Sequence, residues 1–280
     1  MASFGDGRKL LKFGNYNLDG VSLGEGAFGR VEKATHTKVK TKVALKFVEI
    51  KKIKDDYELK YLTREAQLLL ELKHDNIARV IEVVTSKEIY CLCVEYVPGR
   101  TLLDDLQNNG IFSEQKAKEV AAQLSGAIAY IHARGIIHRD LKLENVMISG
   151  VRVVVIDFGL STKWQRGQFM NTHCGSAEYA APELFNRDRY YGPSIDVWSF
   201  GIMLYAMMTG VLPFNSDKSN DQVTLIPKVL KGLGSEQHRL DLMKLSVLAR
   251  SLIKRCLKVD SSKRITSGEI FDDPWIYLDK

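Results

Sequence analysis

A short polar run near the middle of the chain carries side chains suited to a group-transfer reaction. Residues 138–145 read His-Arg-Asp-Leu-Lys-Leu-Glu-Asn, and Asp-Phe-Gly follows at 157–159. Asp140 can accept the proton of an attacking hydroxyl, and Lys142 can neutralise charge on a transferred phosphate. Asn145 and Asp157 supply oxygen ligands for Mg²⁺ ions that bridge phosphates. This order of base, cation and metal ligands predicts phosphoryl transfer from ATP.

With these motifs the chain resembles the eukaryotic protein kinases, from about Tyr16 to Trp275. The resemblance implies an α+β, bilobal fold. A small, mainly antiparallel β-sheet lobe with one regulatory helix would precede a large, mainly α-helical lobe. The expected organisation is a loose tail over 1–15 and a kinase domain over 16–276, with the N-lobe at about 16–97, the hinge at about 95–101 and the C-lobe at about 102–276.

The glycine-rich run at 24–31 is a candidate cover for the phosphates, because glycines let the backbone approach them closely. Alone it also fits an ordinary turn or a dinucleotide-binding loop, which must open a helix. The next element is instead an alternating strand, with Val43, Leu45 and Phe47 on one side. Ala44 and Lys46 therefore share the other face.

Lys46 has a candidate partner in Glu65. A helix is expected from about residue 58 to 73, and it places Glu65 among inward-facing leucines. A buried carboxylate needs a partner, and the family pattern supplies Lys46. In the family this pair fixes the helix against the strand when the enzyme is active. The implied catalytic set is Asp140, Lys142, Lys46 and Glu65.

The apolar strand from Ile89 to Val97 is the hinge strand by resemblance. It implies that Glu95 and Val97 offer backbone hydrogen bonds to adenine and that Val94 lies at the back of the pocket. Met147 would form the floor, although core packing explains Val94 and Met147 equally well. The implied ATP-site residues are Gly24, Glu25, Gly26, Ala27, Phe28, Gly29, Val31, Ala44, Lys46, Val94, Glu95, Val97, Glu144, Met147 and Asp157, with Asn145 and Asp157 as the Mg²⁺ ligands.

The polar stretch after Asp157 is where family members keep an activation segment. Thr172 matches the regulatory phosphothreonine, and Arg139 would bind its phosphate. An unmodified loop threonine is the alternative. Ser176 would contact Asp140 near the acceptor hydroxyl.

Two further residues near the base bear on the substrate. Lys142 is typical of serine/threonine specificity. Glu144 is placed to read an Arg or Lys three residues before the acceptor, with a solvated glutamate as an equal alternative.

Other motifs predict residues with structural roles. Asp196 is expected to hold the catalytic loop from below, and Glu183 to pair with Arg264 inside the larger lobe. The apolar stretch from Trp198 to Leu212 is too short and too interrupted to span a bilayer, which favours a buried helix.

Composition limits the alternatives. The chain has 280 residues, 45% hydrophobic content and a formal charge of +6, too mild and evenly spread for nucleic-acid binding. Its start lacks the pattern of a secretory signal or a myristoylation site, and we expect no membrane insertion. The four cysteines show no metal spacing, so free thiols favour a reducing compartment, the cytoplasm with the nucleus as a second location. The oligomeric state stays open.

Finer motifs resemble the calmodulin-dependent group and its AMP-activated, sucrose-nonfermenting branch: residues 157–161, 174–176, 179–183 and 212–214. That implies protein substrates and an upstream kinase acting on Thr172. Ala177 and Thr101 depart from the usual pattern, which leaves Asp104 as a candidate ribose contact. A catalytically inactive pseudokinase should lack one of Lys46, Asp140, Asn145 or Asp157. A small-molecule kinase should lack the Ala-Pro-Glu at 181–183.

Overall fold

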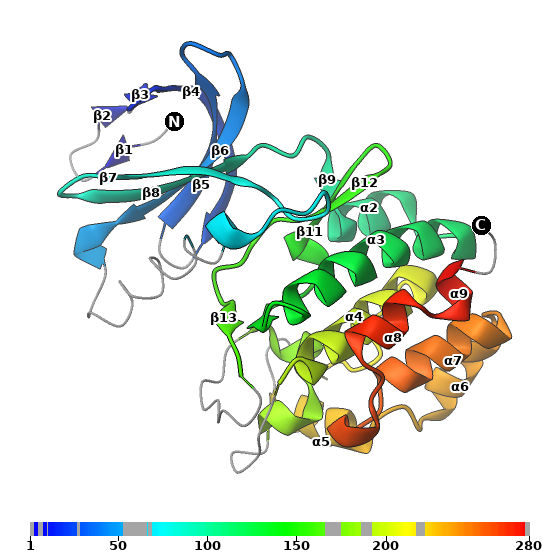
Figure 1. Ribbon diagram of the computed structural model, residues 1–280. Helices are drawn as coiled ribbons and strands as arrows, with labels where there is room; N and C mark the ends of the chain where they lie inside the picture. Colours follow the sequence, from blue (N-terminus) through cyan, green and yellow to red (C-terminus); the bar gives the residue numbers. More distant parts are fainter. Residues whose placement is uncertain are drawn as a thin grey trace. The chain divides into compact units, whose positions relative to one another are not determined.

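The structure is a computed structural model, and it describes residues 3–4, 8–9, 11–26, 29–52, 66, 69–165, 175–185, 192–216 and 222–277. The chain divides into two compact units, Met1–Pro98 and Gly99–Lys280. Figure 1 shows the strands of the first unit and the helices of the second. The predicted α+β kinase fold is confirmed, whereas the predicted tail, domain and lobe bounds stay predictions.

The first unit is built on a curled antiparallel sheet with the strand order β3-β4-β5-β6-β8-β7. Its strands are β3 (Lys12–Phe13), β4 (Tyr16–Gly26), β5 (Gly29–His36), β6 (Lys42–Glu49), β7 (Val80–Thr85) and β8 (Ile89–Glu95). A small hairpin of β1 (Ser3–Phe4) and β2 (Arg8–Lys9) precedes it, and the 3-10 turn η1 (Ile50–Lys52) follows β6.

The two faces of this sheet differ as the alternation in β6 predicts. Val43, Leu45 and Phe47 are at most 1% exposed and form the core. Lys46 is only half-buried, on the opposite face. Because side chains alternate along a strand, a slip of one residue would exchange these faces.

The core also encloses thiols. Cys91 and Cys93 on β8 are free and buried, and so is Cys256 in the second unit. Burial raises the pKa of the Cys93 thiol to about 11, with a smaller rise from the Glu82 charge and an opposing hydrogen bond with Tyr16. Burial likewise raises the pKa values of Cys91 and Cys256.

The second unit is mainly helical. Its helices are α2 (Leu102–Asn109), α3 (Glu114–His132), α4 (Ser194–Thr209), α5 (Gln222–Lys231), α6 (Glu236–Met243), α7 (Val247–Cys256), α8 (Ser267–Phe271) and α9 (Pro274–Tyr277). Short strands and 3-10 turns connect them: β9 (Arg100–Thr101), β10 (Ile136–Ile137), η2 (Leu143–Asn145), β11 (Val146–Ser149), β12 (Arg152–Val155), β13 (Thr162–Lys163), η3 (Ala177–Tyr179), η4 (Pro182–Phe185) and η5 (Ser261–Lys263).

Two helices supply most of the scaffold. Ser113 caps α3 by accepting a hydrogen bond from the Lys116 N–H. Helix α4 is buried along its whole length from Ile195 to Met208. Among the described residues, no helix combines the length and the apolar character needed to cross a membrane.

Candidate active site

Asp196 in the first turn of α4 anchors the polar loop at 138–145. The Asp196 carboxylate accepts hydrogen bonds from the backbone N–H groups of His138 (2.8 Å) and Arg139 (2.9 Å). The same carboxylate lies 2.8 Å from His132 Nε2 on α3. Asp196 is completely buried, so the loop backbone is fixed to two helices inside the second unit.

The charge on Asp196 is retained despite this burial. Burial by itself raises the pKa of this carboxyl, but the hydrogen bond and charge of His132 and the contacts with His138 outweigh it and lower the pKa. The Arg139 backbone has a φ of 71°, a left-handed conformation that is unfavourable for any residue with a Cβ. Hydrogen bonds to the ionised Asp196 carboxylate offset this cost. The two hydrogen bonds to Asp196 therefore hold a strained loop.

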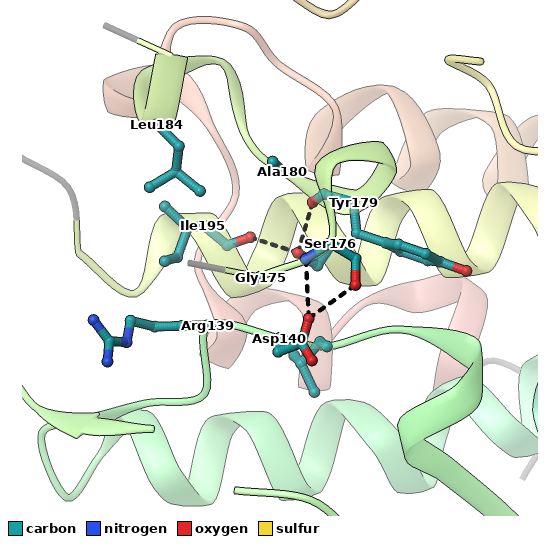
Figure 2. A pocket seen from close by; sticks show the side chains of 10 residues that line it. Arg139, Asp140, Gly175, Ser176, Tyr179, Ala180, Leu184 and Ile195 are labelled. Atoms are coloured by element: carbon teal, nitrogen blue, oxygen red, sulfur yellow. Dashed lines mark hydrogen bonds between the residues drawn. The ribbon is translucent and has the colours of Figure 1, made fainter. Parts of the chain in front are cut away.

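Asp140 stands at the centre of a polar cluster. Its Oδ2 lies 3.0 Å from Lys142 Nζ and accepts a hydrogen bond from Asn145 Nδ2 at 3.1 Å. Its Oδ1 accepts from the N–H and the hydroxyl of Ser176 at 3.1 and 3.2 Å (Figure 2). Lys142 Nζ also donates to Ser176 Oγ at 2.9 Å. The structure thus brings together the predicted base, cation, one metal ligand and the predicted acceptor-side serine.

Gly175 makes this arrangement possible. Its φ is 99°, and a Cβ at this position would lie 2.6 Å from the Arg139 carbonyl oxygen. A larger residue would therefore push the segment away from the loop and take Ser176 with it. The motif at 174–176 is visible in the sequence, but the need for glycine is not, because it arises from a contact with a distant part of the chain.

Beside the cluster lies a small pocket whose walls include Ala180, Leu184 and Ile195 (Figure 2). Arg139 and Asp140 also line it. Arg139 is 7% exposed, and its Nε donates to the Leu160 carbonyl at 2.6 Å. Polar and apolar groups meet here directly next to the candidate base.

His138 has a structural role in this loop. Its ring lies against Phe158, with centroids 4.7 Å apart, and its Nδ1 accepts from the Asp140 N–H at 3.2 Å. Complete burial lowers the pKa of this imidazole, against smaller opposing effects of Asp196, Asp157 and Asp140. The ring is therefore neutral at pH 7 and fixes the backbone before the base.

The two predicted metal ligands offer oxygen atoms that suit Mg²⁺. Asn145 Nδ2 donates to Asp140, so the amide is oriented and its oxygen is the atom left for a cation. Asp157 Oδ1 accepts from the Gly159 N–H at 3.0 Å, which fixes the carboxylate at the turn. Within the described part of the chain, no group of three or more His, Cys, Asp or Glu side chains gathers as a metal site. An amide, a carboxylate and substrate phosphates are the donor set that a weakly held Mg²⁺ uses.

Glu144 has a partner that the sequence does not suggest. Its Oε2 accepts a hydrogen bond from the Tyr179 hydroxyl at 3.4 Å, and Tyr179 is 6% exposed. Burial raises the pKa of the Tyr179 phenol, and the Glu144 charge adds to the rise. Glu144 is half-buried, so it is not the fully solvated glutamate of the alternative interpretation.

The predicted pair of Glu183 and Arg264 is present and buried. Arg264 Nη1 and Nη2 donate to the two Glu183 carboxylate oxygens at 2.7 and 2.9 Å. The Arg264 side chain is 0% exposed, and it also donates to the carbonyls of Ser194, Lys258 and Val259. This guanidinium links the segment at 182–185 to α4 and to the turn after α7.

In the first unit, cross-strand pairing gathers several of the predicted ATP-site residues on one face of the sheet. Lys46 is opposite Val31 on β5, and Ala44 is opposite Val94 on β8. Gly24 is opposite Val31 in turn. Directly paired residues point to the same side, so all five share the face of Lys46.

The glycine loop and the hinge strand show two further constraints. A Cβ at Gly29 would lie 1.8 Å from the Phe47 carbonyl oxygen, which excludes a larger residue. The Glu95 N–H donates to the Arg79 carbonyl at 2.8 Å. The Glu95 N–H is therefore engaged within the first unit. Four predicted site residues, Ala27, Phe28, Glu65 and Thr172, lie outside the described residues.

Three further residues predicted to contact ATP have packing, strand-pairing or helix-capping contacts within their own units. Val97 is buried, and Met147 on β11 is paired with Val154 and Thr101. Asp104, the candidate ribose contact, reaches back to the Thr101 N–H at 3.1 Å and caps α2. That carboxylate has a structural role in the helix cap.

A family model described as a protein kinase domain matches residues 18–276. The chain belongs to this family. The kinase domain is 38% identical over 265 residues to "Probable serine/threonine-protein kinase MARK-A" of Dictyostelium discoideum, covering 94% of this chain and 24% of that protein. It is 39% identical over 255 residues to "SNF1-like protein kinase ssp2" of Schizosaccharomyces pombe, covering 91% of this chain and 43% of that protein.

A solved structure is also similar. The kinase domain matches the structure titled "Crystal structure of Rad53 1-466 in complex with AMP-PNP" with a TM-score of 0.78 and 32% identity, covering 94% of this chain and 65% of that one. The chain spans less than half the length of the curated relatives described above. Similarity to SNF1-like kinases agrees with the predicted branch.

Proposed function

We propose that this kinase domain transfers the γ-phosphoryl group of Mg-ATP to serine and threonine hydroxyls of proteins. The observation that carries the proposal is the arrangement around Asp140, whose two oxygens contact Lys142, Asn145 and Ser176. Its relatives are named as serine/threonine-protein kinases, and Rad53 was solved with AMP-PNP, which supports ATP as the nucleotide.

In this proposal the side chains act on an acceptor hydroxyl placed next to Asp140. Asp140 accepts the hydroxyl proton as the oxygen attacks phosphorus, and Lys142 stabilises charge on the transferred group. Ser176 and Asn145 orient the two carboxylate oxygens, so little reorganisation is needed. Asn145 and Asp157 would hold Mg²⁺, which when bound neutralises charge on the phosphates.

The first unit would bind the nucleotide. Lys46, paired with Glu65, would contact the α- and β-phosphates beneath the glycine-rich segment at 24–29. Val31 and Ala44 share a face with Lys46 and would cover adenine, with Val94 behind it. The Glu95 carbonyl and the Val97 backbone would bind the base.

Regulation and selectivity involve the same residues. An upstream kinase would phosphorylate Thr172, and Arg139 would bind the phosphate. Lys142 favours serine and threonine acceptors. Glu144, held by Tyr179, would read a basic residue three positions before the acceptor. We place the protein in the cytoplasm or nucleus, because its described cysteines are free thiols.

A pseudokinase is the second candidate. It is disfavoured because Lys46, Asp140, Asn145 and Asp157 are all present. Their loss is the usual route to an inactive member of such a fold.

A positional-scanning peptide assay with Mg-ATP distinguishes the active kinase from the pseudokinase, once the protein has been treated with an activating kinase. The wild-type chain should phosphorylate serine and threonine peptides, and Asp140→Asn should reduce transfer by at least 10³-fold, roughly the loss seen on removing an essential group. Nucleotide binding by the variant should persist. No transfer above the Asp140→Asn blank, with ATP still bound, would favour the pseudokinase.

A further inference from the structure

A series of hydrogen bonds runs from α8 to the loop at 138–145. Ser267 Oγ lies 2.9 Å from His132 Nδ1, and His132 Nε2 lies 2.8 Å from Asp196 Oδ2. The Asp196 carboxylate in turn accepts from the backbone N–H groups of His138 and Arg139. Ser267 and His132 are 135 positions apart in the sequence. A side chain of α8 is thereby connected to the candidate active site through α3 and α4.

The positions of the protons in this series follow from the charge of Asp196. Burial raises the pKa of this carboxyl, but hydrogen bonds and nearby charges outweigh burial and lower it, so the group is ionised. An ionised carboxylate only accepts hydrogen bonds, and therefore His132 Nε2 carries a proton. In the neutral ring Nδ1 is then the acceptor, and the Ser267 hydroxyl donates to it. A hydroxyl can also accept from a protonated Nδ1, so it serves the charged ring as well.

The interior position of these groups makes the hydroxyl hard to replace. Ser267 is 8% exposed, and the His132 side chain is 6% exposed. A buried polar atom that loses its partner is not compensated by solvent. Without the hydroxyl, Nδ1 would be left buried, and the contact with Asp196 would be the one hydrogen bond that the described residues still give to this ring.

Ser267 is presented to α3 from a rigid turn. It is the first residue of α8, directly after the N-cap Thr266. The Glu269 N–H donates to Thr266 Oγ1 at 3.3 Å, and Glu269 Oε2 accepts from the Thr266 N–H at 2.8 Å, which completes a capping box. Helix α8 also packs closely on α3 (Figure 1), because a Cβ at Gly126 would lie 3.3 Å from the Phe271 ring.

We propose that Ser267 is a positioning residue for phosphoryl transfer, which acts through His132 and Asp196. The hydroxyl orients the imidazole, and the imidazole holds the carboxylate toward the two N–H groups of the loop. Hydrogen bonds in such a series strengthen one another, so the loss of the first weakens those that follow. The loop would then hold Asp140 less precisely. The effect on catalysis rests on the proposed kinase activity, whereas the effect on the hydrogen bonds does not.

The test compares Ser267→Ala, which removes the hydroxyl, with Ser267→Thr, which keeps it. Hydrogen exchange of the His138 and Arg139 amides is followed by NMR in the chain of residues 1–280. Exchange should be about fivefold faster in Ser267→Ala, the ratio that corresponds to one intramolecular hydrogen bond, and close to the wild-type rate in Ser267→Thr. The nitrogen NMR shifts of the His132 imidazole should show the loss of the hydrogen bond at Nδ1 in the alanine variant alone.

Kinetics with a serine peptide test the link to catalysis. Ser267→Ala should lower kcat about fivefold, by the same reasoning, and Ser267→Thr should restore it. The KM for ATP should be unchanged in both variants, because the residues proposed to contact ATP in the first unit are not altered. This division between kcat and KM distinguishes a positioning role from a general loss of stability.

Ser125→Ala is the matched control. Ser125 is also buried and lies on the same helix as His132, and its hydroxyl donates to the Ala122 carbonyl at 3.1 Å. This variant should keep the amide exchange and the kcat of the wild type.

Three results would overturn the proposal: unchanged exchange in Ser267→Ala, an equal change in Ser125→Ala, or faster exchange with a wild-type kcat. If the wild-type chain itself transfers no phosphoryl group, the proposed function fails, and the exchange rates alone then decide whether Ser267 positions the loop.

Discussion

Replacing Glu183 by Gln tests how far the buried pair with Arg264 stabilises the second unit. The substitution keeps the shape of the side chain and removes its charge. The Arg264 side chain, which is 0% exposed, then loses its charged partner and keeps the Gln amide oxygen and the carbonyls of Ser194, Lys258 and Val259. Removing one partner of a buried pair costs about 3–5 kcal/mol of unfolding free energy. For a unit of this size, that is a fall in melting temperature of roughly 6–20 °C.

The assay is urea and thermal unfolding followed by tryptophan fluorescence. All three tryptophans, at 164, 198 and 275, belong to the second unit, so the signal reports on that unit alone. Trp198 lies under the guanidinium, with Arg264 Cζ 5.0 Å from its ring centroid. The fluorescence of Trp198 therefore also reports directly on the surroundings of the Glu183–Arg264 pair.

The matched control is Glu236→Gln. Glu236 pairs with Arg239 three residues away on α6, but both side chains are more than half exposed. Solvent and salt screen such a pair, so the melting temperature should not change. The reasoning would be refuted by a loss below about 1 kcal/mol in Glu183→Gln, or by an equal loss in the control.

Three further predictions concern the loop and its neighbours. Gly175→Ala should lower kcat at least tenfold at an unchanged KM for ATP, since the added Cβ would meet the Arg139 carbonyl. Gly150 also has a positive φ but has open space around it, so Gly150→Ala should leave kcat unchanged. Equal kinetics in the two variants would contradict this prediction. Burial lowers the pKa of the His138 imidazole. The contribution of this residue to the free energy of unfolding is therefore fully present above pH 6.5, the ordinary pKa of histidine, and it is lost below that pH as the unfolded chain gains a proton. Urea unfolding should show a smaller loss from pH 7.5 to 5.5 in His138→Phe than in wild type, and parallel losses would exclude His138 as the cause. Tyr179→Phe should reduce the preference for Arg over Ala three residues before the acceptor about fivefold, equivalent to one hydrogen bond of about 1 kcal/mol, and an unchanged peptide profile would remove Tyr179 from substrate reading.

The features that the sequence predicts are those that depend on local pattern. Alternation in β6 assigns Lys46 and Phe47 to opposite faces, because a strand has a period of two. The apolar run after Asp196 predicts a buried helix, and α4 is buried throughout. The motif around Asp140 predicts which residue types meet there.

Contacts between distant segments cannot be predicted in this way. The hydrogen bond between Tyr179 and Glu144 joins residues 35 positions apart, and nothing in either motif indicates it. The sequence around His132 indicates only the end of a helix, yet this residue helps to keep Asp196 ionised. Helix α6 is not predicted either, because only Asp241 and Leu242 of its residues are buried, too few to give the apolar face that signals an amphipathic helix.

The buried cysteines give each unit its own chemical reporter of unfolding. Only the thiolate reacts rapidly with alkylating reagents, and raised pKa values leave Cys93 in the first unit and Cys256 in the second almost entirely protonated at neutral pH. Alkylation then requires that the surrounding unit opens. In a Cys174→Ser background, mass spectrometry of the alkylated peptides would follow the opening of the two units separately in one sample, without any engineered reporter. A nucleotide that stabilised one unit more than the other would be recognised from the difference between the two labelling rates.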